Sequence, residues 1–265
     1  MERVMCPPTY FDVEYSINPW MDTANRVDRG LAFEQWHALV EVLEGLGDEI
    51  SVVEAAPGLP DMTFAGDAGL VWRRRFVPSN FRHPERRGEV DHFLRWFEAS
   101  GFEIAPMPDD VFFEGLGDVV FHDGAAFVGY GPRSDERAIE RLREIVPELE
   151  VVGRLSIVDD RYFHLAMALG FIDRETVVYH EPAFTPESVE ALRRAVPRAI
   201  AVGDEDANSY FACNNLVVDG SVILDNCTPG LRADLGAAGY EVITCDMSEF
   251  KKSGGSLRCL VLTVM

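Results

Sequence analysis

The sequence predicts an α/β fold built from about five copies of one unit, in which two strands are followed by a helix and a third strand. Four aromatic residues recur roughly every fifty residues: Phe64, Phe113, Phe163 and Phe211. A loop of small or polar residues accompanies each one, and two apolar runs follow each loop. No linker rich in Pro, Gly or Ser divides the chain, so we expect a single domain over residues 1–265.

Apolar residues at helical spacing, with helix-boundary residues at the ends, predict five helices. The predicted helices span residues 33–46, 84–100, 134–145, 186–196 and 231–238. Gly47 and Gly101 stand where the first two should end, and glycine is favoured just beyond a helix C-terminus. Thr185 stands where an N-cap should precede the fourth.

The apolar runs predict hairpins directly after the loops and single strands after the helices. Hairpins are expected at 70–78, 119–131, 170–180 and 215–224, and single strands at 49–55, 102–107, 149–155, 199–203 and 240–246. Asp123–Gly124 and Asp219–Gly220 are strong turn signals. The last run, 259–265, has no helix after it, so we expect it to pair with residues 3–6 and close a propeller-like ring. An open α/β sheet with coincidental spacing is the alternative, and it does not explain why the order of elements also repeats.

Composition narrows the classes of function. A hydrophobic content of 47% excludes a disordered chain. The formal charge of −21 argues against partners such as nucleic acid or an anionic membrane, and favours cationic small molecules. No apolar run is long enough for a transmembrane helix, and the N-terminus lacks the features of a signal peptide. Five cysteines without a CxxC pair fit reduced thiols, so a cytoplasmic location is expected.

The repeated loops deliver a different chemical group each time. In chain order they carry Asp67, Glu114, His164, Asn214 and Cys259. A thiol, an imidazole and two carboxylates on equivalent loops are the parts of an enzyme that uses a nucleophile. Taken singly, each has a structural interpretation as well, as a buried apolar thiol, a core histidine or a polar turn residue.

The motifs DMTFAGD, FEGLGD, FHL, FACN and KSGGSLRC resemble those of the guanidino-group-modifying enzymes. This superfamily includes dimethylarginine dimethylaminohydrolases, arginine deiminases, amidinotransferases and arginine dihydrolases. The first residues, MCPPTYFDVEYSINPWM, look most like the dihydrolase branch. The resemblance covers nearly the whole chain and implies a pentein fold, an α/β propeller of five ββαβ units with pseudo-fivefold symmetry and the active site on its axis.

The resemblance also implies the chemistry. Cys259 would attack the guanidinium carbon of arginine or an N-substituted arginine, forming a covalent thiouronium and expelling ammonia or an alkylamine. His164 would protonate the leaving amine and then activate water, which yields citrulline. Glu114 would orient His164 and contact the guanidinium, and Asp67 would make paired hydrogen bonds to it. Gly254 and Gly255 would allow close approach or positive φ before the nucleophile.

Substrate anchoring is expected to use arginine forks, which match a carboxylate. Arg86 lies nineteen residues after Asp67, and Arg133 lies nineteen after Glu114. By resemblance both bind the α-carboxylate of the substrate, with Arg82 and Arg87 as rivals for the first role. Asp61 is expected at the α-amino group or the site wall, and Asn18 at the entrance. Asp61 as a turn residue and Asn18 as a cap are the structural alternatives.

Four other functions stay open within the resemblance. An arginine dihydrolase would continue to ornithine, ammonia and carbon dioxide, but that branch characteristically carries Asn where this chain has Asp67. A deiminase would carry Asp where this chain has Ala166. An amidinotransferase is usually longer, and a binding-only pentein would not need the catalytic set. No motif for a metal, nucleotide or other cofactor is present, and a homo-oligomer is possible.

Overall fold

The computed structural model describes residues 1–122 and 124–264, and its strands form five separate three-stranded sheets. All five sheets have the same topology. Two strands pair antiparallel, and a third strand, which follows a helix, pairs parallel to the second. The two antiparallel strands are consecutive in four sheets, and in the fifth they come from the two ends of the chain. The predicted order of strand, strand, helix and strand is confirmed in each sheet. No sheet among the described residues closes on itself.

Four of the units run continuously along the chain. The first consists of β3 (Gly69–Trp72), β4 (Arg75–Pro78), α2 (Val90–Ala99) and β5 (Glu103–Ile104), and the second of β6 (Val119–His122), β7 (Ala125–Tyr130), α4 (Arg137–Ile145) and β8 (Glu150–Ser156). The third consists of β9 (Leu169–Phe171), β10 (Thr176–Tyr179), α6 (Pro186–Ala195) and β11 (Arg198–Ala201). The fourth consists of β12 (Leu216–Val218), β13 (Ser221–Leu224), α7 (Pro229–Ala237) and β14 (Glu241–Thr244).

The fifth unit joins the two ends of the chain. Its elements are β15 (Leu262–Thr263), β1 (Glu2–Met5), α1 (Arg29–Gly45) and β2 (Glu49–Val52). Arg3 in β1 pairs antiparallel with Thr263 and parallel with Ile50. The predicted pairing between the first and last apolar runs is therefore confirmed.

The predicted helices all exist, but some boundaries were wrong. Helix α1 begins at Arg29 because the Asp28 side chain accepts the Leu31 N–H and caps it there. The predicted helix 84–100 is divided into a 3₁₀ segment, η3 (Pro84–Glu89), and α2. A 3₁₀ helix aligns residues three apart, which places Arg86 and Glu89 on one face. The Thr185 cap of α6 is confirmed.

Several strand predictions were too long: residues 49–55 form a strand only over Glu49–Val52, and residues 240–246 only over Glu241–Thr244. For two further strands the physical reason is clear. β5 covers only Glu103–Ile104, and Pro106 lacks the N–H that would continue its ladder. The last strand begins at Leu262, because Cys259 lies in a 3₁₀ turn, η7 (Leu257–Leu260), that packs against the preceding loops. The Asp219–Gly220 turn is confirmed, and both residues have positive φ. The Asp123–Gly124 turn includes a residue outside those described.

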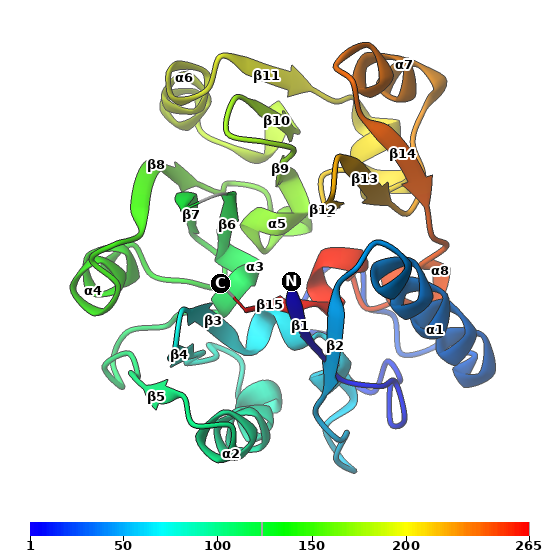
Figure 1. Cartoon of the computed structure of the whole chain (residues 1–265). Helices are drawn as coiled ribbons and strands as arrows, with labels where there is room; N and C mark the ends of the chain where they lie inside the picture. Colours follow the sequence, from blue (N-terminus) through cyan, green and yellow to red (C-terminus); the bar gives the residue numbers. More distant parts are fainter. Residues whose placement is uncertain (123, 265) are drawn as a thin grey trace.

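The five sheets surround a common centre, and the long helices α1, α2, α4, α6 and α7 lie at the periphery (Figure 1). Four short helical turns lie nearer the centre: η2 (Ala65–Ala68), α3 (Gly115–Asp118), α5 (Leu165–Ala168) and η7. They pack pairwise, α3 against both η2 and α5, and η2 against η7. The sequence analysis did not predict these turns.

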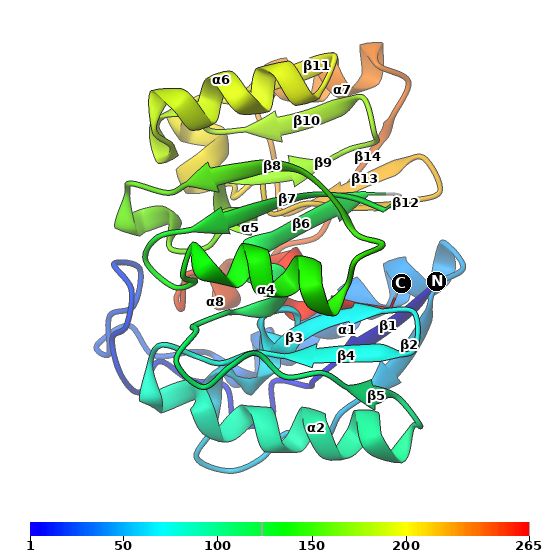
Figure 2. The same cartoon turned by 90° about the vertical axis from the view of Figure 1, so that its left-hand side faces the viewer.

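The two faces of the molecule differ. Both chain ends lie on one face, and the long loop between β1 and α1 lies on the opposite face (Figure 2). None of the helices in the described part of the chain is long and apolar enough to cross a membrane.

Candidate active site

The short central turns bring together the side chains that the repeated loops carry. Glu114 directly precedes α3, and His164 directly precedes α5. Asp67 lies in η2 and Cys259 lies in η7. Each of the four is at least 96% buried. Residues about fifty apart in sequence therefore meet because the units that carry them are equivalent.

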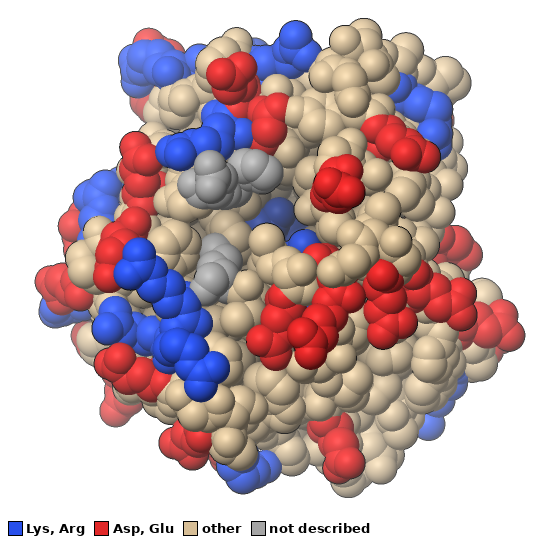
Figure 3. All heavy atoms as spheres, in the orientation of Figure 1, with Lys and Arg blue, Asp and Glu red and all other residues tan. Residues whose placement is uncertain are grey.

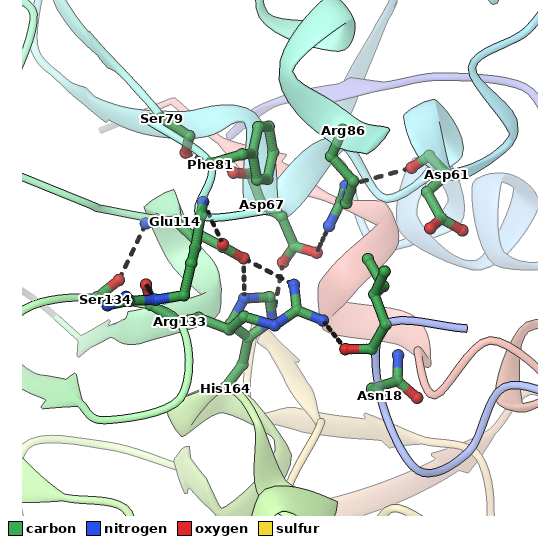
Figure 4. Close-up of polar contacts among 12 residues, drawn as sticks. Asn18, Asp61, Asp67, Ser79, Phe81, Arg86, Glu114, Arg133, Ser134 and His164 are labelled. Atoms are coloured by element: carbon green, nitrogen blue, oxygen red, sulfur yellow. Dashed lines mark hydrogen bonds and ion pairs between the residues drawn. The ribbon is translucent and has the colours of Figure 1, made fainter. Parts of the chain in front are cut away.

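His164 lies between two carboxylates (Figure 4). Its Nε2 is 2.8 Å from Glu114 Oε2, and its Nδ1 is 3.7 Å from Asp67 Oδ1. Burial opposes protonation of the ring, but Asp67, Asp118 and Glu114 outweigh it and raise the pKa of His164. A charged imidazole with one nitrogen anchored and the other free can deliver a proton.

Glu114 is held in its ionised form. Burial alone would raise its pKa, but Arg133 and His164 bring the pKa of Glu114 below its usual range. Arg133 Nη1 donates to Glu114 Oε2 at 3.0 Å, and its Nη2 donates to the Ile17 carbonyl at 3.1 Å. The Ser134 hydroxyl accepts the Glu114 N–H. Glu114 therefore links Arg133 to His164 within one buried network.

Arg86 is enclosed by acidic groups. Its Nη1 donates to Asp67 Oδ2 at 2.8 Å, and its Nε and Nη2 make a fork to Glu89 at 3.0 and 2.9 Å. Nη2 also contacts the Asp61 carbonyl. Burial raises the pKa of Glu89 to about 7, although Arg86 opposes that shift. The geometry fixes one oxygen of Asp67 on Arg86 and leaves the other oxygen without a hydrogen-bond partner.

Cys259 is a protonated thiol in this arrangement. Burial, followed by the negative charge of Asp67, raises its pKa to about 12. The Asn214 amide contacts the sulfur at 3.4 Å and the Ala166 carbonyl at 2.9 Å. The fourth loop thus supplies a side chain to the site, and the sequence analysis gave Asn214 no role.

The segment before α1 covers the site. Asn18 Nδ2 donates to the Ser253 carbonyl at 3.0 Å, and its Oδ1 accepts the Trp20 N–H, so it also forms the turn that was its structural alternative. Asp61 accepts from the Tyr15 hydroxyl at 2.8 Å and from Ser253 at 3.2 Å. Burial raises the pKa of Asp61 despite Arg86.

Six of the eight predicted site residues line a small cavity, the inner cavity, whereas Glu114 and His164 are not among its lining residues. Asn18, Asp61, Asp67, Arg86, Arg133 and Cys259 line it, together with Phe163 and Gly254. Its volume is about 10 Å³, which holds about one water molecule. A wider hollow of about 450 Å³, the outer hollow, shares Asn18, Arg133 and Phe163 with the inner cavity and also includes His83. The inner cavity is therefore nearly filled by its own side chains, and Asn18, Arg133 and Phe163 lie between it and the outer hollow.

The rival arginines do not line either cavity. Arg82 pairs with Asp135 at 2.7 Å, and Arg87 donates to the Phe81 carbonyl. Gly254 has φ +79, and a Cβ there would lie 2.9 Å from Trp20, as expected for a loop that needs glycine.

Several residues of the network were missed. Glu89 holds Arg86, and its spacing of three from Arg86 was the signal available. Asp118 accepts the Leu165 N–H at 3.0 Å and so fixes the residue after His164. Gly117 lies against the His164 ring, where a Cβ would be 2.9 Å from Cγ. Both belong to the FEGLGD motif. Within residues 1–122 and 124–264, no group of His, Cys, Asp and Glu is arranged to hold a metal ion.

The family model described as "N,N dimethylarginine dimethylhydrolase, eukaryotic" matches residues 11–265. The chain belongs to this family. The N(G),N(G)-dimethylarginine dimethylaminohydrolase of Mycobacterium tuberculosis is 37% identical over 261 residues, which cover 98% of this chain and 84% of that protein. The resemblance that the sequence motifs carried is therefore confirmed.

The chain is also similar to part of a larger cyanobacterial protein. The bifunctional arginine dihydrolase/ornithine cyclodeaminase AgrE of Nostoc sp. is 34% identical over 266 residues. That match covers 98% of this chain but only 37% of AgrE. The chain thus corresponds in length to about one third of that protein.

Solved structures agree with the fold. The N-terminal domain of ArgZ, a cyanobacterial arginine dihydrolase, solved as a Cys-to-Ser variant bound to its substrate, has a TM-score of 0.93 at 34% identity. The match covers 98% of this chain and 97% of that one. The Pseudomonas aeruginosa dimethylargininase, at 20% identity and a TM-score of 0.79, shares the fold. The fold of this chain is therefore the pentein fold of these two proteins.

Proposed function

We propose that this chain is a cofactor-free, cysteine-dependent hydrolase of the guanidino group of arginine or an N-methylated arginine. The observation that carries the proposal is the buried set of Cys259, Asp67 and His164, in which Asp67 and Cys259 line one cavity and Asp67 faces His164. A guanidinium is cationic, and this set offers it a carboxylate, a thiol and an acid within one site. The named activities of the similar dimethylaminohydrolase and arginine dihydrolase support the same chemistry.

Binding of the cation would activate the nucleophile. Asp67 offers its unpartnered Oδ1 to a guanidinium N–H, while Arg86 holds Oδ2. A cation beside Cys259 offsets the negative field of Asp67, which is one of the causes that keep the thiol protonated. The thiol then gives its proton to solvent, because His164 is already protonated, and the thiolate attacks the guanidinium carbon.

His164 would handle the protons of both steps. As the C–N bond breaks, Nδ1–H gives its proton to the leaving ammonia or alkylamine, which leaves a thiouronium on Cys259. Neutral His164 then takes a proton from water, and the water attacks the same carbon. The C–S bond breaks, the remaining hydroxyl proton of the intermediate passes to solvent or to the released amine, citrulline forms and the thiolate returns. Glu114 keeps Nε2 anchored throughout.

The α-carboxylate of the substrate would bind Arg133 and Arg86. Arg133 borders both the inner cavity and the outer hollow, so it meets an entering substrate first. Arg86 is already paired with Asp67 and Glu89, so a carboxylate must replace one of them. Asp61 and Asn18 would hold the α-amino group and the entrance.

A second candidate is arginine dihydrolase activity, which would hydrolyse citrulline further to ornithine. The observation that favours it is the TM-score of 0.94 with the N-terminal domain of ArgZ bound to product. Asp67 favours the first candidate, because a carboxylate binds a cation well and gains little from a neutral ureido group.

The architecture we propose is a single pentein domain over residues 1–265, with its five ββαβ units closed as a pseudo-fivefold α/β propeller. The equivalent topology of the five sheets supports this. The five free cysteines support a cytoplasmic location. A homo-oligomer is compatible with the proposal.

The test is to incubate the protein with arginine, monomethylarginine and dimethylarginine, and to identify products by mass spectrometry. We expect citrulline with ammonia, methylamine or dimethylamine. Cys259→Ser should abolish turnover, whereas Cys227→Ser, at another buried thiol, should keep most of it. Full activity in Cys259→Ser would falsify the mechanism.

A further inference from the structure

The face that carries both chain ends contains a third cavity, which is much larger than the inner cavity. Its volume is about 330 Å³, and it is lined by two arginines, Arg3 and Arg258, and by Met1, whose N-terminal ammonium pairs with Asp48. Figure 3 shows a hollow near the middle of this face, with Lys or Arg atoms at its floor. The walls are mostly apolar and come from Leu116, Phe121, Leu216 and Val217. We call this cavity the terminal pit.

Arg258 is a buried cation without a counter-ion. Its exposed fraction is 8%, and its Nε has no hydrogen-bond partner. No ion pair to it is found among residues 1–122 and 124–264. Arg3, in contrast, pairs with Asp48 at 2.8 Å and contacts Thr263. An unpaired charge in a buried site is unfavourable, so an anion that reaches Arg258 should be retained there.

The guanidinium stays charged despite this position. Burial, followed by repulsion from Arg3, lowers the pKa of Arg258 to about 10. The lining residues of the terminal pit therefore carry three cationic groups. The Met1 ammonium and Arg3 are paired with Asp48, and Arg258 is not paired. This is unusual on a protein of formal charge −21, whose surface on average repels anions.

We propose that the terminal pit binds a small carboxylate with an apolar body, held at its charged end by Arg258 and Arg3. A guanidinium fork matches the two oxygens of a carboxylate. The leucine, valine and phenylalanine walls offer nothing to a fully hydrated ion such as phosphate, but they can bury a short chain or a ring. The volume admits a molecule of a few carbon atoms and excludes a peptide segment.

The terminal pit is separate from the candidate active site but adjoins it. Arg258 lines the pit, and its neighbour Cys259 lines the inner cavity on the other side of η7. The Arg258 N–H donates to Asn214 Oδ1 at 2.9 Å, and Asn214 Nδ2 contacts the Cys259 sulfur. One short turn thus forms a wall of both cavities.

Isothermal titration with sodium benzoate and sodium butyrate, at constant ionic strength, tests the proposal. We expect saturable one-site binding, at least about tenfold tighter than sodium acetate or sodium phosphate, because only the larger carboxylates bury apolar surface. Arg258→Met should weaken binding at least about tenfold through loss of a charge-assisted contact. Phosphate binding as tightly as benzoate would overturn the assignment of the ligand class.

Two variants separate the pit from the active site and guard against misfolding. Val217→Glu places a carboxylate in the wall of the pit and should also abolish binding, without altering Arg258. Arg133→Met removes a cation of the inner cavity and should leave benzoate binding unchanged. Benzoate binding that is lost in Arg133→Met but retained in Arg258→Met and Val217→Glu would overturn the proposal.

Discussion

His164 Nδ1 and Asp67 Oδ1 face each other at 3.7 Å, and neither atom has a hydrogen-bond partner. Both atoms are buried, so the arrangement leaves two polar groups unsatisfied in the interior. The opposite atoms of the same side chains are firmly held, Nε2 by Glu114 and Oδ2 by Arg86. The two free atoms therefore mark the position at which a substrate guanidinium and its leaving group would complete the network.

The first prediction concerns His164 as the proton carrier. His164→Ala should still allow a slow attack by Cys259, but the thiouronium should persist because no base activates water. Mass spectrometry of the denatured variant after incubation with arginine should detect the adduct. His37→Ala, at an exposed histidine, is the control. Normal steady-state turnover by His164→Ala would contradict the assignment.

The second prediction concerns stability as a function of pH. Burial lowers the pKa of His164, but Asp67, Asp118 and Glu114 outweigh it and raise the pKa above its ordinary value of 6.5. The folded state then binds this proton more tightly than the unfolded state does. The resulting stabilisation is fully present below about pH 6.5 and is lost as the pH rises through the folded-state pKa.

The free energies of unfolding in urea of the wild type and of His164→Gln should therefore differ most near pH 6. The difference should shrink at higher pH, because only the protonated imidazole stabilises the folded state, and glutamine cannot supply that charge. His37→Gln, at an exposed position, should show no such trend. A difference between wild type and His164→Gln that stays constant from about pH 6 to 9 would mean that the imidazole is not held protonated.

The third prediction separates the roles of Arg133 and Arg86, the two buried arginines that line the inner cavity. Arg133→Met should raise KM for arginine much more than for agmatine, which lacks the α-carboxylate. Loss of a charge-assisted contact costs roughly 2–3 kcal/mol, which is a thirtyfold or larger effect. Arg86→Met should impair both substrates, because Arg86 also holds Asp67. Steady-state kinetics decide this, and equal losses on both substrates for Arg133→Met would indicate a structural role.

The fourth prediction concerns the extent of hydrolysis. Asp67→Asn should slow the first step, because a neutral amide binds a cation less well than a carboxylate does. An amide can both donate to and accept from a ureido group, so citrulline should be retained and some ornithine should form. Product analysis over time checks this. Ornithine as the main product of the unmodified protein would show that Asp67 does not limit the reaction to citrulline.

The positions of the catalytic candidates were predictable because a repeated unit places equivalent loops in equivalent places. Asp67, Glu114, His164 and Cys259 were all identified this way, and the structure brings them together. Glu89 and Asp118 were missed because neither stands at the repeated loop position. They matter through the partners they fix, Arg86 and the turn after His164.

The sequence alone determined the order and number of the units, the pairing of the chain ends and the identity of the groups delivered to the centre. These follow from local periodicity, turn residues and spacing, which act within one unit. Tertiary structure decided the ionisation and partners of those groups. Asp67 is shared between Arg86 and His164, Cys259 is a buried protonated thiol, and Arg258 stands unpaired behind it. Such properties depend on distances between units and on exclusion of water, and no pattern within a single unit specifies either.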